Sequence, residues 1–290
     1  MELNKRNVLT PKLQTKPDKE LLRKAKKQKV KKTLLLLISV IVILSVGVIV
    51  CYNYITGRLD DANDVSKNEN IAFIDSVNGV KFNMIKIEGG TFNRDVKAKK
   101  QKSKNSNRQE SINVTSFCIG QTEVTQELWQ AVMGANPSFF KEDKCPVENV
   151  SWYEAIAFCE KLSQITGRKY YLPTMSQWQF AAMGGMKSQG FKYSGSPNIG
   201  DVAWLSNNSG GKTHIVAEKK PNELGIYDMS GNVWEWCSDV RTSGAKKDSI
   251  GVYCGGAWVI GNKYSQVSSK TECRLEYKGN IVGFRIACDK

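Results

Sequence analysis

The sequence predicts an α+β fold that is rich in loops and is preceded by one transmembrane helix. Three observations lead to this prediction. An uncharged apolar stretch covers residues 33–55, well-marked helices follow within residues 126–185, and short strand-like segments separated by Gly, Asn and Ser turns fill the chain after Gly184. Helices and strands that occur in separate runs are typical of α+β proteins rather than of α/β proteins.

The helices are predicted from their starting residues and their apolar periodicity. Two of them begin with Ser or Thr followed three residues later by Glu or Gln, which is the capping box that satisfies free backbone N–H groups. An apolar stripe at helical spacing follows in each. The predicted helices cover residues 126–133, 151–167 and 172–185, with capping boxes at Ser151/Glu154 and Thr174/Gln177. Before them, FNMIKIEGGTF alternates and then turns at Gly89-Gly90, as a strand does.

The stretch TLLLLISVIVILSVGVIVCYNYI (residues 33–55) predicts a helix that crosses a membrane. At about 1.5 Å per residue it is long enough for a hydrocarbon core of about 30 Å. A buried core helix of this length would show a polar face, and a cleaved signal peptide would have a shorter basic segment and a small-residue cleavage site. Val50 before Cys51 does not fit a bacterial lipid-anchoring signal.

Charge sets the orientation of this span. The formal charge is +14, but residues 1–32 carry twelve Lys or Arg and three acidic residues, so most of the excess lies in this tail. Basic segments stay on the cytoplasmic side. The tail could also bind anionic lipid or nucleic acid, but the topology signal accounts for it, and no nucleic-acid partner is expected. The predicted parts are a cytoplasmic tail (1–32), the span (33–55), a linker (56–80) and a periplasmic or extracellular domain (81–290).

Cysteine and histidine counts exclude many enzyme classes. Seven of the eight cysteines lie after the span, where disulfides persist, and an odd number leaves at least one thiol unpaired or bonded between chains. His214 is the one histidine of the chain. It cannot supply a three-histidine metal site, and no HExxH motif or second histidine for a separate triad exists. Residues 97–108, which are basic and of low complexity, are expected to be a solvated insertion.

Six motifs in order resemble the formylglycine-generating enzyme family, also called the sulfatase-modifying factor family. They are MIKIEGGTF (84–92), IGQTEVTQELWQAVMG (119–134), PVENVSWYEAIAFCEKL (146–162), LPTMSQWQFAAMGG (172–185), PNELGIYDMSGNVWEWCSD (221–239) and GGAW…VGFRIA (255–287). The resemblance covers about 210 residues. It implies a variant of the C-type lectin fold, and it is closest in character to the bacterial members that are secreted or attached to a membrane.

The resemblance also implies a structural calcium ion in the GNVWEW segment. Its ligands would be the side chains of Asp228 and Glu235 and the carbonyl oxygens of Gly231 and Val233. A hard cation takes oxygen ligands, and a loop can direct carbonyl groups at it. Asp228 departs from relatives that have an amide at this position. The alternative is a metal-free turn fixed by Trp234 and Trp236.

The copper site of the family's enzymes is missing from the sequence. Those enzymes oxidise a substrate cysteine to formylglycine with oxygen and with copper held by two cysteines after the GG-small-aromatic motif. Here GGAWVIGNKYS places Ile260 and Ser265 at those positions, and neither is a soft ligand for Cu(I). Copper is therefore not expected. Cys254, just before the motif, could be a substitute thiol, but a disulfide partner is the preferred role.

Two disulfides are predicted. Cys159 resembles a helix cysteine that, in the family's enzymes, bonds a cysteine on the last strand, and Cys288 lies two residues past that place on the same strand face. Cys118 is the alternative partner of Cys288. Cys254 and Cys273, on neighbouring predicted strands, form the second predicted pair.

The sequence favours a membrane-anchored, non-catalytic binding or accessory module of the cell envelope over a diverged enzyme acting on protein cysteine or another substrate. Some relatives of this fold display variable side chains between the GG and GFR motifs. The expected ligand is an envelope protein, a peptide or a glycan. The candidate surface residues are Trp258, Asn262, Tyr264, Arg274 and Arg285.

Overall fold

The computed structural model describes residues 27, 31, 70–96, 108–243 and 248–290 of the 290-residue chain. The predicted span and most of the predicted tail, linker and basic insertion therefore lie outside the described residues. None of the helices within the described part is both long and apolar enough to cross a membrane. All elements below belong to the compact unit Asn68–Lys290.

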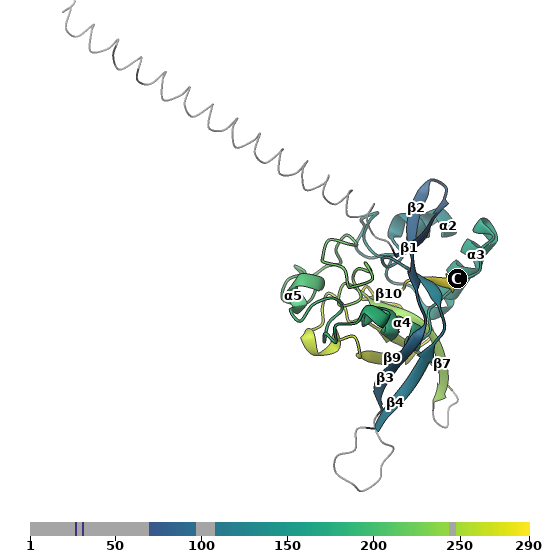
Figure 1. Ribbon diagram of the computed structural model, residues 1–290. Helices are drawn as coiled ribbons and strands as arrows, with labels where there is room; N and C mark the ends of the chain where they lie inside the picture. Colours follow the sequence, from purple (N-terminus) through teal and green to yellow (C-terminus); the bar gives the residue numbers. More distant parts are fainter. Residues whose placement is uncertain (1–26, 28–30, 32–69, 97–107, 244–247) are drawn as a thin grey trace, which may run out of the picture. The chain divides into compact units, whose positions relative to one another are not determined.

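A five-stranded sheet with the order β1-β2-β5-β11-β6 brings distant parts of the chain together (Figure 1). Its neighbouring strands are antiparallel. Strand β11 lies between β5 and β6, although it comes last in the sequence. The bounds are β1 Ile71–Val77, β2 Val80–Ile87, β5 Phe117–Gly120, β6 Tyr170–Tyr171 and β11 Ala287–Asp289.

Strand β1 corrects the predicted start of the domain. Residues 71–80 were expected to be part of a tether, but β1 pairs with β2 through a hairpin turn at Asn78 and Gly79. Both turn residues have positive φ, 51° and 86°, as the favoured two-residue hairpin turns require. The folded domain therefore begins about ten residues before Lys81.

Two smaller sheets complete the β structure. Strands β3 (Gly90–Val96) and β4 (Arg108–Val114) form a two-stranded antiparallel ribbon, which Figure 1 shows as a long extension. The other sheet has the order β10-β7-β8-β9 and contains one parallel pair, β10 with β7. Its bounds are β7 Trp234–Ser243, β8 Asp248–Cys254, β9 Lys270–Arg274 and β10 Val282–Gly283.

The helices confirm the predicted capping boxes, and two of the three have the predicted ends. Helix α2 covers Gln126–Met133, and helix α3 covers Trp152–Thr166 with the Ser151/Glu154 capping box and Gly167 at its end. Helix α4 covers Met175–Ala182, shorter than the predicted 172–185, and has the Thr174/Gln177 capping box. Short helical turns are η1 Gly185–Lys187, α5 Ile199–Val202 and η2 Asn262–Tyr264.

Both faces of the five-stranded sheet are buried. Alternate strand residues point to opposite faces. Accordingly Met84 belongs to the core cluster that contains helices α2 and α3, whereas its neighbour Ile85 belongs to the cluster that contains helix α4. The same alternation separates Cys118 from Ile119 on β5. The sheet is therefore a central layer with helices on each side, and the long loops after α4 are attached to this scaffold.

Candidate functional site

The GIYDMSGNVWEW segment forms a buried loop that leads into β7. Backbone hydrogen bonds tie it to two other loops, from Gly231 N–H to the Gly255 carbonyl (2.8 Å) and from Asn232 N–H to the Trp204 carbonyl (3.0 Å). Gly231 has φ +87°, and a Cβ there would lie 2.4 Å from the Trp204 oxygen. Only glycine fits this approach without displacing backbone.

Glu235, at the start of β7, forms a fully buried ion pair with Arg285. The Arg285 Nε donates to Glu235 Oε2 (2.6 Å) and Nη2 donates to Oε1 (2.7 Å). The indole N–H of Trp178 also donates to Oε2 (2.6 Å). Arg285 further donates to the Gly120 and Tyr227 carbonyls. A buried pair with so many hydrogen bonds orients the loop, the start of β7 and the GFR segment relative to one another.

Arg285 corrects one prediction of the sequence analysis. It was expected on the binding surface, but its side chain has no exposed area. Its charge is matched by Glu235 in the interior, so it has a structural position rather than a ligand-facing one.

Three buried carboxylates surround this one guanidinium. Glu123, Asp228 and Glu235 are 1%, 2% and 0% exposed. Burial and the charges of Asp228 and Glu235 raise the pKa of Glu123 well above its usual value. Burial, opposed in part by the hydrogen bond from the Ala217 N–H, raises the pKa of Asp228 to about 6. When all are ionised, the cluster carries two negative charges in excess.

The predicted calcium ligands can be tested against this geometry. Asp228 Oδ1 is buried without a hydrogen-bond partner, and so is Glu123 Oε1. Glu235 Oε1 accepts one hydrogen bond, from Arg285, and a carboxylate oxygen can accept two. A divalent cation would neutralise the excess charge. The residues therefore fit a calcium ion held by Asp228, Glu235 and loop carbonyls. No three His, Cys, Asp or Glu side chains of the described part form a metal cluster by themselves, so the carbonyl oxygens would be essential.

Glu123 is a member of this cluster that the sequence analysis missed. It lies in the TEVT segment between β5 and α2. Its sequence neighbours include Gln121, Thr122, Thr125 and Gln126, so no local pattern distinguishes it from an exposed acid.

Packed side chains without a soft donor atom occupy the two positions that hold copper in the family's enzymes. Ile260 packs against the core cluster of helices α2 and α3. Ser265 has no exposed area, and a Cβ on Gly256 would be 2.2 Å from its hydroxyl oxygen, so the side chain sits against the backbone of the GG motif. The two residues do not fit a copper ion, because neither offers a soft donor.

An exposed aromatic surface lies next to these positions. Phe139 is 69% exposed and packs edge-to-face on Phe140, which in turn packs edge-to-face on Trp258. The indole N–H of Trp258 donates to the Asn280 carbonyl (2.9 Å). Tyr264, on the same loop as Trp258, is 53% exposed. We call Phe139, Phe140 and Trp258, whose rings contact one another in turn, the aromatic surface. Phe139 and Phe140 were not predicted, because they lie about 120 residues before Trp258.

The predicted surface residues Asn262 and Arg274 are also exposed. Asn262 is exposed in η2, within the loop between Trp258 and Tyr264. Arg274 is exposed at the end of β9.

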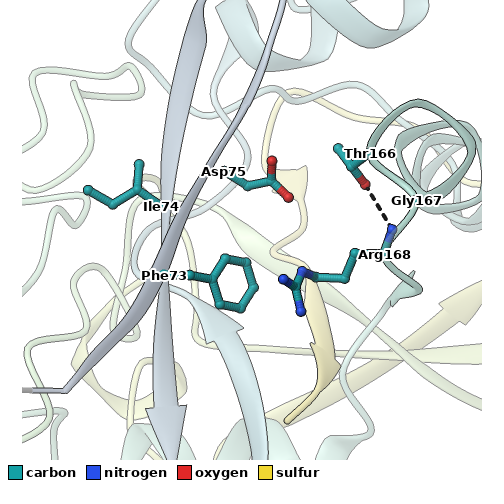
Figure 2. A pocket seen from close by; sticks show the side chains of 6 residues that line it. All are labelled: Phe73, Ile74, Asp75, Thr166, Gly167 and Arg168. Atoms are coloured by element: carbon teal, nitrogen blue, oxygen red, sulfur yellow. Dashed lines mark hydrogen bonds between the residues drawn. The ribbon is translucent and has the colours of Figure 1, made fainter.

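A separate hollow of about 420 Å³ lies between β1 and the end of α3 (Figure 2). Its polar groups are engaged with their neighbours. The guanidinium of Arg168 lies over the Phe73 ring at 3.9 Å, and Asp75 accepts a hydrogen bond from the Tyr170 hydroxyl (2.8 Å). Thr166 accepts from the Arg168 N–H, as Figure 2 shows. This hollow contains no predicted site residue.

Cys288 lies directly opposite Cys118 on neighbouring antiparallel strands. Their side chains are hydrogen-bonded, and this bond lowers the pKa of Cys118 to about 7 and raises that of Cys288. Cys159, from helix α3, belongs to the same core cluster. The predicted Cys159–Cys288 disulfide stays a prediction, while the strand register favours the alternative partner, Cys118.

Cys254 and Cys273 are not brought together as expected. On β9, Cys273 lies opposite Gly251, and Cys254 lies opposite Lys270. The Cys254 sulfur instead contacts that of Cys237, on β7, at 3.9 Å. The predicted pair assumed a register that the two strands do not have.

Comparisons with known proteins agree with this fold. A family model described as the Sulfatase-modifying factor enzyme 1-like domain matches residues 76–290. The chain is 33% identical to the chaperone protein LppX of Paenibacillus barcinonensis, over 73% of this chain and 91% of LppX. It is 28% identical to the inactive C-alpha-formylglycine-generating enzyme 2 of Bos taurus, over 57% of each chain. Among solved structures, Treponema denticola variable protein 1 is similar with a TM-score of 0.65 and 32% identity, over 75% of this chain and 99% of that chain.

Proposed function

Because this chain belongs to the sulfatase-modifying factor family, with a domain of that kind over residues 76–290, we propose that it is a non-catalytic binding or accessory module displayed on a membrane. The span at residues 33–55 would hold the domain on the outer side of the membrane. The domain would contact an envelope protein, a peptide or a glycan.

One observation carries the non-catalytic part of the proposal. The two positions that hold copper in the family's enzymes are Ile260, packed against the core, and Ser265, fully buried against Gly256. Restoring a metal site would require both residues to change. The name of one relative, an inactive formylglycine-generating enzyme, is in keeping with loss of activity in this family.

The aromatic surface supports the binding part of the proposal. Exposed aromatic rings supply a large contact area at little entropic cost, and they are enriched at binding sites. Phe139 packs on Phe140 but remains 69% exposed, so much of its ring is available to a ligand. Another relative is named a chaperone, and an accessory role toward another protein would agree with that name.

We include calcium in the proposal as a structural ion. It would be bound by Asp228, Glu235 and the carbonyl oxygens of Gly231 and Val233, and it would supply positive charge to a buried cluster that has an excess of carboxylates. Loop order, rather than chemistry on a substrate, would depend on it.

Copper binding and peptide oxidation test the non-catalytic role. Purified full-length protein is titrated with Cu(I) against a chromogenic chelator and is incubated with a cysteine-containing sulfatase peptide. We expect no tight copper binding and no loss of sulfur from the peptide by mass spectrometry. Formation of the aldehyde would instead support a diverged enzyme. The double variant Ile260→Cys/Ser265→Cys is expected to gain copper binding without turnover.

Capture of envelope components tests the binding role. Solubilised envelope is passed over the immobilised wild-type chain, over Phe139→Ala and over the matched control Ile74→Ala, whose side chain is also exposed (58%) but lies on β1. We expect a component that is retained by wild type and by the control but is reduced at least about tenfold by Phe139→Ala, as the loss of one aromatic anchor predicts. Equal capture by all three proteins would count against the aromatic surface.

A further inference from the structure

Two buried cysteines lie side by side on β7 and at the end of β8, directly before the GG motif. The sulfurs of Cys237 and Cys254 are 3.9 Å apart, and neither residue has any exposed area. Cys254 is followed directly by Gly255 and Gly256, which begin the loop that carries Trp258 and Tyr264.

The backbone explains why these two residues meet. Glu235 lies opposite Cys254, and Trp236 lies opposite Tyr253, but the register then shifts before Val240. Cys237 falls within this irregular stretch. A bulge bends its strand and redirects its side chains, so Cys237 is not held to the regular position opposite β8. Its thiol can therefore reach toward Cys254.

The surroundings leave the two thiols little other chemistry. Both belong to the apolar cluster that contains Trp178 and Met229. The thiol of Cys237 donates to Cys254, and its other contact is the carbonyl of Glu235, also at 3.9 Å. Burial, followed by the contact with Cys254, raises the pKa of Cys237 well above its usual value. In the folded protein the Cys237 thiol is therefore a poor nucleophile, because the thiolate is the reactive form.

We propose that Cys237 and Cys254 form a disulfide while the chain folds. The oxidant is a disulfide of a thiol oxidoreductase or of oxidised glutathione. One cysteine thiolate attacks it and gives a mixed disulfide, and the second thiolate then displaces the remaining thiol. The two cysteines lose two electrons and two protons, and the oxidant is reduced to two thiols. The bond forms before β7 and β8 enclose the sulfurs.

This disulfide would fix the base of the loop that carries part of the aromatic surface. It joins β7 to Cys254, the last residue of β8 before Gly255, so the N-terminal end of the GG segment is fixed to β7. It does not rest on the proposed binding role, because it concerns two side chains inside the domain. The loop that it closes contains about 17 residues, from which a rise of the thermal midpoint of about 5–10 °C is expected.

Peptide mapping tests the pairing directly. The full-length chain is refolded in detergent with reduced and oxidised glutathione, alkylated, and digested without reduction. Cleavage after Arg241, Lys263 and Lys270 puts Cys237, Cys254 and Cys273 in three different peptides. We expect the Cys237 and Cys254 peptides to be linked. Linkage of Cys254 to Cys273, or alkylation of both Cys237 and Cys254, would overturn the proposal.

Stability provides a second measurement. The thermal midpoint of the wild-type chain should be higher when it is oxidised than when it is reduced. This difference should be much smaller for the double variant Cys237→Ser/Cys254→Ser. The control is Cys145→Ser, since Cys145 is also buried but does not belong to the apolar cluster that contains Cys237 and Cys254. An unchanged difference in the double variant would show that other cysteines cause it and would contradict the proposal.

Discussion

At the scale of single residues, Glu148 is a buried acid whose carboxylate has few hydrogen-bond partners. Its side chain has no exposed area, Oε1 accepts the Phe140 N–H (2.8 Å), and Oε2 has no partner. Burial raises its pKa, although hydrogen bonds from the Phe140 and Phe139 backbone oppose this shift. A raised pKa in the folded state means that folding favours the protonated acid. Its stabilising contribution is complete below the unfolded pKa, about 4.3, and is lost as the pH rises through the folded pKa.

Glu148→Gln should therefore be more stable than the wild type at pH 8 and similar to it near pH 4. The amide keeps an oxygen for the Phe140 N–H and carries no charge at any pH. Thermal midpoints measured between pH 4 and pH 8 test this, with the exposed Glu142→Gln as the control. A difference that does not change with pH would show that ionisation of Glu148 is not its cause.

Gly231 and Gly134 provide a matched pair for the tight loop contact. Both have positive φ, +87° and +93°, but only at Gly231 would a Cβ meet an atom within 4 Å, the Trp204 oxygen at 2.4 Å. Gly134→Ala should lower the free energy of unfolding by about 1–2 kcal/mol, because alanine must adopt the left-handed conformation there. Gly231→Ala should cost about 2 kcal/mol more because backbone must move. Denaturant unfolding measures both free energies, and equal losses would exclude a role for the contact with Trp204.

At the scale of elements, the loop before β7 should respond to calcium removal. A structural ion at about 100 times its dissociation constant stabilises the folded state by about 2.7 kcal/mol. Chelation should accordingly lower the thermal midpoint by roughly 5–10 °C. Asp228→Asn should reduce this response, whereas Asp201→Asn, on the exposed side of α5, should retain it. Identical melting curves with and without chelator would mean that the loop needs no ion.

Local rules predicted the helices, while pairing between distant segments was not predictable. The capping boxes at Ser151 and Thr174 depend on residues three positions apart, so the sequence is sufficient. Strand β1 was missed although Asn78-Gly79 is a hairpin signal, because the preceding segment is mostly polar and was read as part of the tether.

The candidate site was predicted in part. The GNVWEW segment was expected to be a loop, but its residues from Trp234 onward belong to strand β7 (Trp234–Ser243), and the burial of Arg285 was not foreseen. Its partner Glu235 is 50 residues away, and a sequence does not reveal which charges meet in the interior. Phe139 and Glu123 were missed for the same reason, since tertiary contacts rather than local patterns place them.

At the scale of the whole molecule, the charge step across residues 33–55 predicts the topology. In intact spheroplasts, added protease should remove the domain at residues 81–290 and leave a fragment that contains the tail. An epitope placed before residue 33 should be protected until the membrane is opened. Protection of the domain with digestion of the tail would reverse the orientation, and digestion of both would argue against a membrane span.

Strand order also constrains when this domain can fold. Gly120 and Arg285, which are hydrogen-bonded, lie 165 residues apart along the chain. The central sheet lacks its β11 strand until residues 287–289 are present, so the N-terminal strands cannot complete their layer as they leave the ribosome. Contacts this distant in sequence close slowly. A chain that ends before β11 leaves β5 and β6 without the strand that joins them, so we expect such a truncated chain to be more sensitive to proteases than the complete domain.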